Sequence, residues 1–219
     1  MVLGGRYTLR DSNTQYDMSG ALNSRSRENG VFVPYAGVVY DWSATTSLYA
    51  STAEIYQSQA GKFSAPLPGA PLDPVRGRTY ELGVKSELTP NLIASAALFR
   101  TDKKGEAVYD PAYPQTDWRG GCCYFRDGFK LSQGIDLEMT GRITPNLQLA
   151  VGYTYNSNRN KVTNVNYHSI TPRHLLRLWS SYRLRDELSG WTVGGGVNLQ
   201  SAHFVNGTAR ARRSERFHA

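Results

Sequence analysis

Apolar residues alternate with polar or small residues along several long stretches of this chain. The clearest stretch is Leu147–Tyr155, which reads Leu-Gln-Leu-Ala-Val-Gly-Tyr-Thr-Tyr. The same period of two recurs in Tyr80–Lys85, Ile135–Thr140 and Trp191–Gln200. Successive side chains of a β-strand point to opposite faces, so this pattern predicts strands with one apolar and one polar face.

Weaker alternation extends the prediction to about nine strands in all. The additional strands are expected over Val2–Arg10, Pro34–Trp42, Ser47–Gln57, Leu92–Thr101 and Leu175–Arg185. Several strands run for roughly 9–12 residues, which exceeds a usual globular strand and matches a tilted strand that crosses a membrane. No stretch of the sequence has a convincing helical period. We therefore predict an all-β chain, folded as an antiparallel up-and-down meander.

The expected connections alternate between short turns and long polar segments. The short turns are Asp41–Thr46, Glu87–Asn91, Arg142–Asn146 and Leu184–Gly190. The long segments, rich in Gly, Pro, Asn and Tyr, are Asp11–Asn29, Ser58–Arg76, Asp102–Gly128 and Asn156–Thr171. Two short turns contain Thr-Pro-Asn, which favours a tight turn between antiparallel strands. Short turns at one rim and long loops at the other are typical of transmembrane barrels.

The two strand faces favour a membrane barrel over a soluble one. The polar face carries mid-strand charges, among them Glu81 with Lys85 and Asp136 with Glu138, which suit a water-filled lumen. The hydrophobic fraction is 40%, and 14 of those residues are Tyr, so bulky apolar volume is scarce for a soluble sandwich. The longest run without a strongly polar residue, Leu92–Phe99, is too short for a membrane helix. Alternation alone leaves a soluble barrel open.

Charge and cysteine spacing give no sign of nucleic-acid or zinc binding. The net charge is +7, but the basic residues before the C-terminal tail alternate with acids, so we expect no nucleic-acid partner. Cys122 and Cys123 are adjacent, which is neither zinc-ligand spacing nor a CxxC redox motif. An oxidising compartment would favour a vicinal disulfide between them. The first residues contain no signal peptide, which indicates either a cytosolic chain or a missing start.

No constellation in the sequence supports an enzyme or a resident cofactor. Asp136 and Glu138 share a strand face without a nearby nucleophile, so we interpret them as solvated lumen charges balanced by Arg142 and neighbouring strands. The histidines have no metal-ligand spacing. Gly194–Gly196 lies inside an expected strand and lacks the context of a phosphate loop. We expect no catalytic residue, no metal and no cofactor.

Five short motifs follow one another in a fixed order. They are Leu3–Tyr7, Pro34–Ser51, Leu72–Lys85, Gly134–Tyr155 and Thr171–Val197, and together they cover about residues 2–203. The segment Leu72–Lys85 contains Pro74, Gly77, Tyr80 and Glu81 at the spacing P..G..YE.G.K. In this order and spacing, the motifs resemble the TonB-dependent outer-membrane receptors, in the style of their ferric-siderophore branch.

The resemblance implies a bacterial outer-membrane location and part of a 22-stranded transmembrane barrel. Because the plug domain and TonB box of that family are missing here, we expect residues 1–205 to be a partial receptor barrel. Residues 206–219 are expected to be a non-barrel tail, truncated or out of frame. The implied partners are a ferric siderophore, outer-membrane lipid and, through the missing plug alone, the TonB–ExbB–ExbD system. The implied function is uptake of ferric siderophores, and the alternative is a passive porin-like or soluble carbohydrate-binding barrel.

The ligand is expected to meet the long segment between Tyr109 and Arg126. Long loops on a rigid scaffold gather recognition residues, and aromatic faces with arginines suit a ferric chelate rich in anionic or carbonyl oxygens. The predicted contacts of this outer loop are Tyr109, Tyr113, Trp118, Arg119, Tyr124 and Arg126. Tyr56 and the loop that carries Phe63 are expected on the same rim. The alternative is a loop that packs only on itself and its neighbours.

Overall fold

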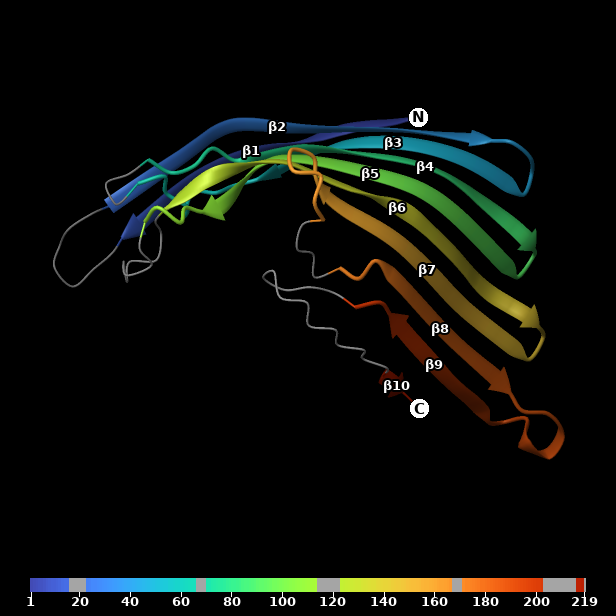
Figure 1. Ribbon diagram of the computed structural model, residues 1–219. Helices are drawn as coiled ribbons and strands as arrows, with labels where there is room; N and C mark the ends of the chain where they lie inside the picture. The colour runs from blue at the N-terminus through green and yellow to red at the C-terminus, as the bar shows by residue number, and fades with distance from the viewer. Residues whose placement is uncertain (16–22, 66–69, 114–122, 167–170, 203–215, 219) are drawn as a thin grey trace.

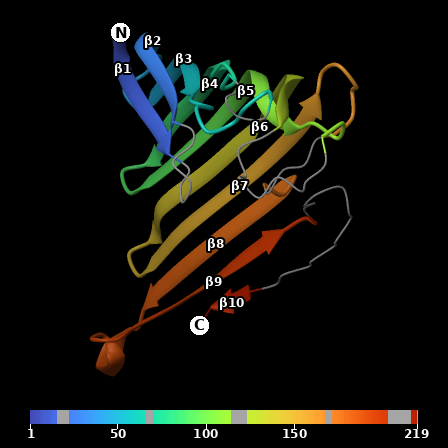
Figure 2. The same cartoon turned by 90° about the vertical axis from the view of Figure 1, so that its left-hand side faces the viewer.

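The chain folds into a single antiparallel sheet in which each strand pairs with its neighbours in sequence. The computed structural model describes residues 1–15, 23–65, 70–113, 123–166, 171–202 and 216–218. Within these residues, the sheet has ten strands: β1 (Val2–Gln15), β2 (Asn23–Asp41), β3 (Thr46–Gln57), β4 (Val75–Thr89), β5 (Leu92–Tyr109), β6 (Tyr124–Thr144), β7 (Leu147–Asn160), β8 (His174–Arg183), β9 (Thr192–Gln200) and β10 (Arg216–His218). Figures 1 and 2 show the strands following one another around an arc from β1 to β10.

The predicted meander is confirmed, with one strand more than expected. β10 comprises three residues and pairs with β9 through Phe217 opposite Val197. It lies in the segment predicted as a non-barrel tail, and three residues are too few to produce a detectable alternation. The assignment of that tail to a separate region stays a prediction.

Short connections gather at one end of the sheet and long ones at the other (Figure 1). β4 and β5 are joined through Pro90 and Asn91, and β6 and β7 through Pro145 and Asn146, as the repeated Thr-Pro-Asn motif predicts. The β8–β9 connection holds one turn of 3₁₀ helix, Asp186–Leu188. Among the described residues, no helix is long and apolar enough to cross a membrane.

The strands extend beyond the predicted ones at the long-connection end. β5 continues to Tyr109 instead of ending at Thr101, and β6 begins at Tyr124 inside the predicted loop Asp102–Gly128. Both faces of a strand meet water once it leaves the membrane, so the alternation that marks a half-apolar strand disappears there. The long loops expected from the sequence are therefore partly strand.

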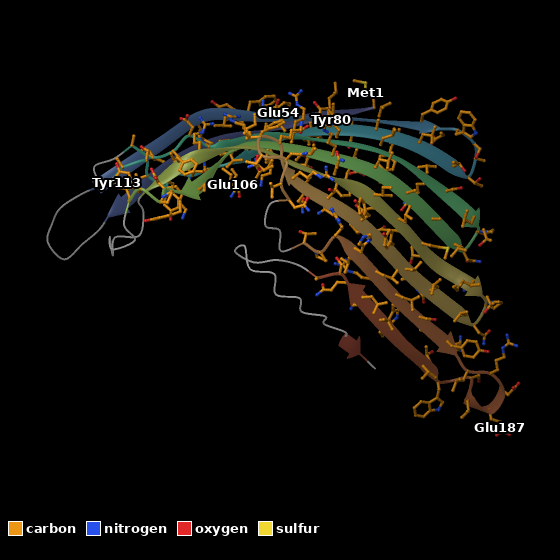
Figure 3. The ribbon with its side chains drawn as sticks, in the orientation of Figure 1. Met1, Glu54, Tyr80, Glu106, Tyr113 and Glu187 are labelled. Carbon is orange, nitrogen blue, oxygen red and sulfur yellow. The ribbon has the colours of Figure 1, made fainter. Side chains whose placement is uncertain are left out.

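Cross-strand register joins the apolar residues into rows on one face. In one such row the direct neighbours are Ala50, Leu82, Leu98, Ile135 and Tyr155. Leu82 and Leu98 are 59% and 55% exposed, so no second layer among the described residues covers this face. Figure 3 labels Tyr80 and Glu54, which share the face, on the convex side of the sheet. This apolar convex face is the side of a barrel that faces lipid.

The polar residues of the alternating strands lie on the concave face. Glu81, Asp136 and Glu138 lie on it, and the Tyr49 hydroxyl donates a hydrogen bond of 2.8 Å to Oε1 of Glu81. Arg142, expected to balance the acids, instead donates to Oδ1 of Asn91 at 2.6 Å. The described residues contain no ion pair between Arg142 and either Asp136 or Glu138.

Candidate ligand-binding rim

The β5–β6 hairpin rises above the apolar band of the convex face. On β5, alternate residues of this face are apolar from Leu92 to Leu98 and become charged at Arg100, Asp102 and Lys104. This change marks the level at which lipid tails give way to polar surroundings. The hairpin continues past that level to Tyr109 on β5 and Tyr124 on β6. The outer end of the hairpin therefore lies beyond the membrane, at the end of the sheet that carries the long connections.

Two of the predicted contact residues meet at the outer end of this hairpin. Tyr109 and Tyr124 are direct cross-strand partners, and their rings meet edge to face with centroids 5.9 Å apart. The Tyr109 hydroxyl donates a 2.6 Å hydrogen bond to the carbonyl of Tyr113. Tyr109 and Tyr124, expected in a loop, thus stand on strands, where the pairing fixes their positions.

The β3–β4 connection folds against this hairpin. We refer to residues 58–65 and 70–74 as the strap. Phe63 is fully buried in it, and Val75 and Cys123 are also buried. The carbonyl of Phe63 accepts a hydrogen bond of 2.9 Å from the backbone N–H of Tyr124. The expectation that the loop bearing Phe63 shares the rim with Tyr109 and Tyr124 agrees with this contact.

Lys62 of the strap reaches the ring of Tyr124. Its Nζ donates to the Tyr124 hydroxyl at 3.2 Å and lies 4.4 Å from the ring centroid. An ammonium group over an aromatic face gains cation–π attraction. The outer rim therefore combines aromatic faces with a cation, which is the chemistry expected for an anionic chelate, although Lys62 was not among the predicted contacts.

Gln59 attaches the strap to the free edge of β5. β4 starts at Val75, so among the described residues no strand pairs with this edge of β5 beyond Lys104. The Gln59 amide donates to the carbonyl of Gly105 at 2.8 Å and accepts from the N–H of Ala107 at 2.6 Å. A single buried side chain thus replaces the missing ladder bonds of a neighbouring strand.

Arg126 is engaged within the rim. Its Nη1 lies 2.9 Å from Oδ2 of Asp73 in the strap. Gly105 on the facing strand has a φ of +77°, and a Cβ there would lie 2.6 Å from Nη2 of Arg126. The glycine therefore provides both the left-handed backbone and the room for the guanidinium. Arg126 was predicted as a ligand contact, and here its first partner is the carboxylate of Asp73.

Three predicted residues lie outside the described part of the chain: Trp118, Arg119 and Cys122. Cys123 is 2% exposed, and its carbonyl accepts a hydrogen bond of 2.9 Å from the backbone N–H of Asp110. The vicinal disulfide and the ligand contacts of Trp118 and Arg119 stay predictions. Tyr56 belongs to β3 on the convex face, where the Arg76 guanidinium lies 5.1 Å from its ring centroid.

Below the rim, an ionic cluster marks the convex face of β5. Asp102 lies 3.0 Å from Nε of Arg100 and 3.1 Å from Nζ of Lys161. Partial burial would raise the pKa of Asp102, but the hydrogen bonds from Arg100 and Lys161 outweigh burial and hold the pKa below its ordinary value of 3.8. The carboxylate is therefore charged at any physiological pH.

The concave face contains a hollow of about 410 Å³ across β6, β7, β8 and β9. One row of its lining runs from Glu138 through Gly152 and Arg177 to Asn198. A Cβ at Gly152 would meet no atom within 4 Å, so this glycine opens the space between an acid and a guanidinium. The hollow belongs to the polar wall of the lumen.

Within the described ranges, no group of three or more His, Cys, Asp or Glu side chains could hold a metal ion.

A one-layer curved sheet with an apolar convex face, a charged concave face and long outer connections is the wall of an outer-membrane β-barrel. The family model for the TonB dependent receptor-like β-barrel matches residues 1–216, and the chain belongs to this family.

Curated relatives include several ferric-pyoverdine receptors. The chain is 37% identical over 204 residues to the ferric-pyoverdine BN7/BN8 receptor of Pseudomonas putida, covering 92% of this chain and 24% of the relative. It is 34% identical over 216 residues to the ferric-pyoverdine M114 receptor PbuA of Pseudomonas sp. strain M114, with 93% and 25% covered. The chain thus spans about a quarter of the length of these relatives.

Solved receptor structures contain the same sheet. The alcaligin outer-membrane receptor FauA of Bordetella pertussis superimposes with a TM-score of 0.73 at 32% identity, covering 90% of this chain and 34% of that structure. The ferripyoverdine receptor of Pseudomonas aeruginosa, solved with ferripyoverdine bound, gives a TM-score of 0.75 at 28% identity, with 98% and 28% covered.

Proposed function

We propose that this chain forms part of the wall and outer rim of a receptor that takes up a ferric siderophore, with a ferric pyoverdine as the favoured substrate. The observation that carries the proposal is the rim cluster, in which the β5–β6 hairpin provides Tyr109 and Tyr124 and the strap provides Lys62. Ferric-pyoverdine receptors among the relatives of this chain support the substrate class.

In this proposal, the rim supplies contact area and charge. Aromatic faces bury a chelate at low entropic cost, while cationic side chains donate to its anionic or carbonyl oxygens. Trp118 and Arg119 lie in the sequence between Tyr109 and Tyr124, and we propose that they contribute an aromatic face and a guanidinium to the same site. The strap fixes the base of the site through Gln59 and Phe63.

Passage through the barrel would depend on the energy-coupling partners of the family. We propose that the TonB–ExbB–ExbD system acts on the complete receptor through its plug domain. The charged concave face then forms one side of the passage, with Glu81, Asp136 and Glu138 in contact with water or with the plug.

The test uses a complete receptor whose barrel contains these strands. Trp118→Ala and Arg119→Ala should each weaken binding of labelled ferric pyoverdine by about 1–2 kcal/mol, the scale of an interfacial anchor. Trp42→Ala is the matched control, because Trp42 is 71% exposed at the opposite, short-turn end of the sheet. If both variants bind labelled ferric pyoverdine as tightly as the parent does, the siderophore site lies elsewhere in the receptor. Uptake that persists without the TonB system would instead favour a passive pore.

A further inference from the structure

A trough crosses four neighbouring strands on the lumen side of the wall. It is the hollow of about 410 Å³ on the concave face, and two rows of residues border it. The outer row, nearer the long connections, is Glu138, Gly152, Arg177 and Asn198, and the inner row, nearer the short turns, is Thr140, Ala150, Trp179 and Gly196. The rows are about 7 Å apart along the strands, and the four strands span about 14 Å. The volume is in the range of pockets that hold small-molecule ligands.

The ring of Trp179 forms an aromatic platform in the inner row. A Cβ at Gly196 of β9 would lie 2.7 Å from Cε3 of Trp179, and a Cβ at Gly194 would lie 3.3 Å from its Cζ2. The ring therefore lies against β9 where these glycines have no side chains. Trp179 is nevertheless 49% exposed, so part of the ring is open to the lumen. A flat surface held in this way offers stacking area to a planar ligand group at low entropic cost.

Arg177 supplies the positive charge of the outer row. Among the described residues, no carboxylate lies within ion-pair distance of its guanidinium. The acid of the same row, Glu138, is two strands away, about 10 Å at the backbone. Between them, a Cβ at Gly152 would meet no atom within 4 Å. An anionic group that enters the trough is therefore attracted to the Arg177 end and repelled from the Glu138 end.

The trough lies within the membrane-spanning part of the wall. Val151 and Leu178 are direct partners whose side chains lie on the lipid face, and both residues also line the floor of the trough. The rim around Tyr109 and Tyr124 lies beyond the lipid-facing band, at the outer end of the sheet. A ligand captured at the rim and carried inward along this wall would therefore reach the trough after it leaves the rim.

We propose that the trough is a second binding site for the ferric chelate, used during its passage through the barrel. Anionic oxygens of the chelate pair with Arg177, a planar ring of the chelate stacks on Trp179, and the Asn198 amide donates to its carbonyl oxygens. The trough thus repeats the chemistry of the rim, where Lys62 and Tyr124 combine a cation with an aromatic ring. This inference rests on the proposed function, from which it takes the substrate class.

The experiment compares capture with uptake in cells that carry the complete receptor. The probe is labelled ferric pyoverdine, and both its affinity for the cell surface and its rate of uptake at saturating concentration are measured. Arg177→Gln should leave the affinity unchanged and lower the rate of uptake by about fivefold or more. Arg177→Lys should retain more of the rate, because it keeps the charge. Trp179→Ala should also slow uptake, and Trp179→Phe should retain part of the rate.

The chemistry of the ligand provides a second readout, which a merely structural role of Arg177 would not change. The comparison probe is ferric pyoverdine whose free carboxylates have been converted to amides. In the parent receptor, this probe should enter more slowly at saturation than the unmodified chelate. In Arg177→Gln, the two chelates should enter at the same rate. A difference that persists in Arg177→Gln would overturn the inference.

Arg142→Gln is the matched control, because it removes the same charge from the same face near the short turns, where Arg142 donates to Asn91. This variant should take up the chelate as the parent does. Uptake at the parent rate in Arg177→Gln, or an equal loss in Arg142→Gln, would overturn the inference. Entry of vancomycin into cells with Arg177→Gln alone would also overturn it, because such a leak would assign the trough to docking of the plug.

Failure of this inference can be distinguished from failure of the proposed function. A parent receptor that does not bind ferric pyoverdine would refute both. A parent that imports the chelate, with an Arg177→Gln variant that imports it equally well, would refute only the second site. Heat-dependent gel migration confirms that each variant is folded.

Discussion

The ring of Tyr49 occupies the space that a side chain at Gly83 would need. The two residues are direct partners on β3 and β4, and a Cβ at Gly83 would lie 2.4 Å from Cζ of Tyr49. From this position, the Tyr49 hydroxyl reaches Glu81 at 2.8 Å. Because Gly83 on β4 has no side chain, the ring of Tyr49 on β3 can lie over it and bring its hydroxyl to Glu81. The resulting hydrogen bond joins β3 and β4 on the lumen face.

Gly83→Ala should destabilise the complete barrel by about 1–3 kcal/mol, because the methyl group displaces Tyr49 and its hydrogen bond to Glu81. Gly152→Ala is the control on the same face, since a Cβ there meets nothing within 4 Å. That change should cost under about 0.5 kcal/mol or stabilise the strand. Unfolding in urea measures both values, and equal losses at the two sites would contradict the packing argument.

Val151→Arg should destabilise the barrel by about 2–4 kcal/mol, because Val151 lies on the convex face between Met139 and Leu178 and meets lipid. The same change at Gln148, on the concave face of the same strand, should cost little. Unfolding free energies in lipid vesicles provide the measurement. If both arginines cost the same, the assignment of the faces is wrong.

Gln59→Ala should release the strap from β5. Without the Gln59 amide, the buried carbonyl of Gly105 and the partly buried N–H of Ala107 lose their hydrogen-bond partner. The expected cost is about 1–3 kcal/mol for each group. We expect faster hydrogen exchange at Ala107 and faster proteolysis of the strap. Gln57→Ala, which removes an exposed amide just before the strap, should leave both rates unchanged.

Asp102 gives a pH dependence with a definite sign. Its pKa in the folded chain is lowered, so the unfolded chain takes up the proton first, near the ordinary value of 3.8. The stability from its pairs with Arg100 and Lys161 is therefore complete above that value and is lost as pH falls through the lowered pKa. The difference between parent and Asp102→Asn, at most ~1 kcal/mol, should persist at pH 5. A difference that disappears by pH 5 would contradict the ion-pair geometry.

Alternation in the sequence predicts the strands and their faces wherever one face meets lipid. Leu147, Leu149 and Val151 share the convex face, as predicted, because only that face must be apolar. The same rule fails above the membrane. There Lys103, Lys104 and Glu106 lie on β5, although their polarity resembles that of a loop.

The ligand-binding role of the rim stays a prediction, and the contacts within the rim could not be predicted from the sequence. Aromatic and basic residues between Tyr109 and Arg126 indicate a binding surface, and Tyr109 and Tyr124 do lie together. The bonds of Gln59 to β5 join residues 46 and 48 positions apart, so no local pattern contains them. Arg126 looks like a ligand contact in the sequence because its partner, Asp73, lies 53 positions away along the chain.

The order of the strands has a consequence for how such a wall is assembled and diversified. Because each strand pairs with the next one in sequence, every hairpin can close locally, and the low sequence separation of these pairings favours rapid folding. The two-residue turns between β4 and β5 and between β6 and β7 make these hairpins the fastest units to form. A hairpin is also an exchangeable module. Recombination at two short turns can exchange one pair of strands, together with the outer connection between them, for another pair. The register of the remaining wall stays intact.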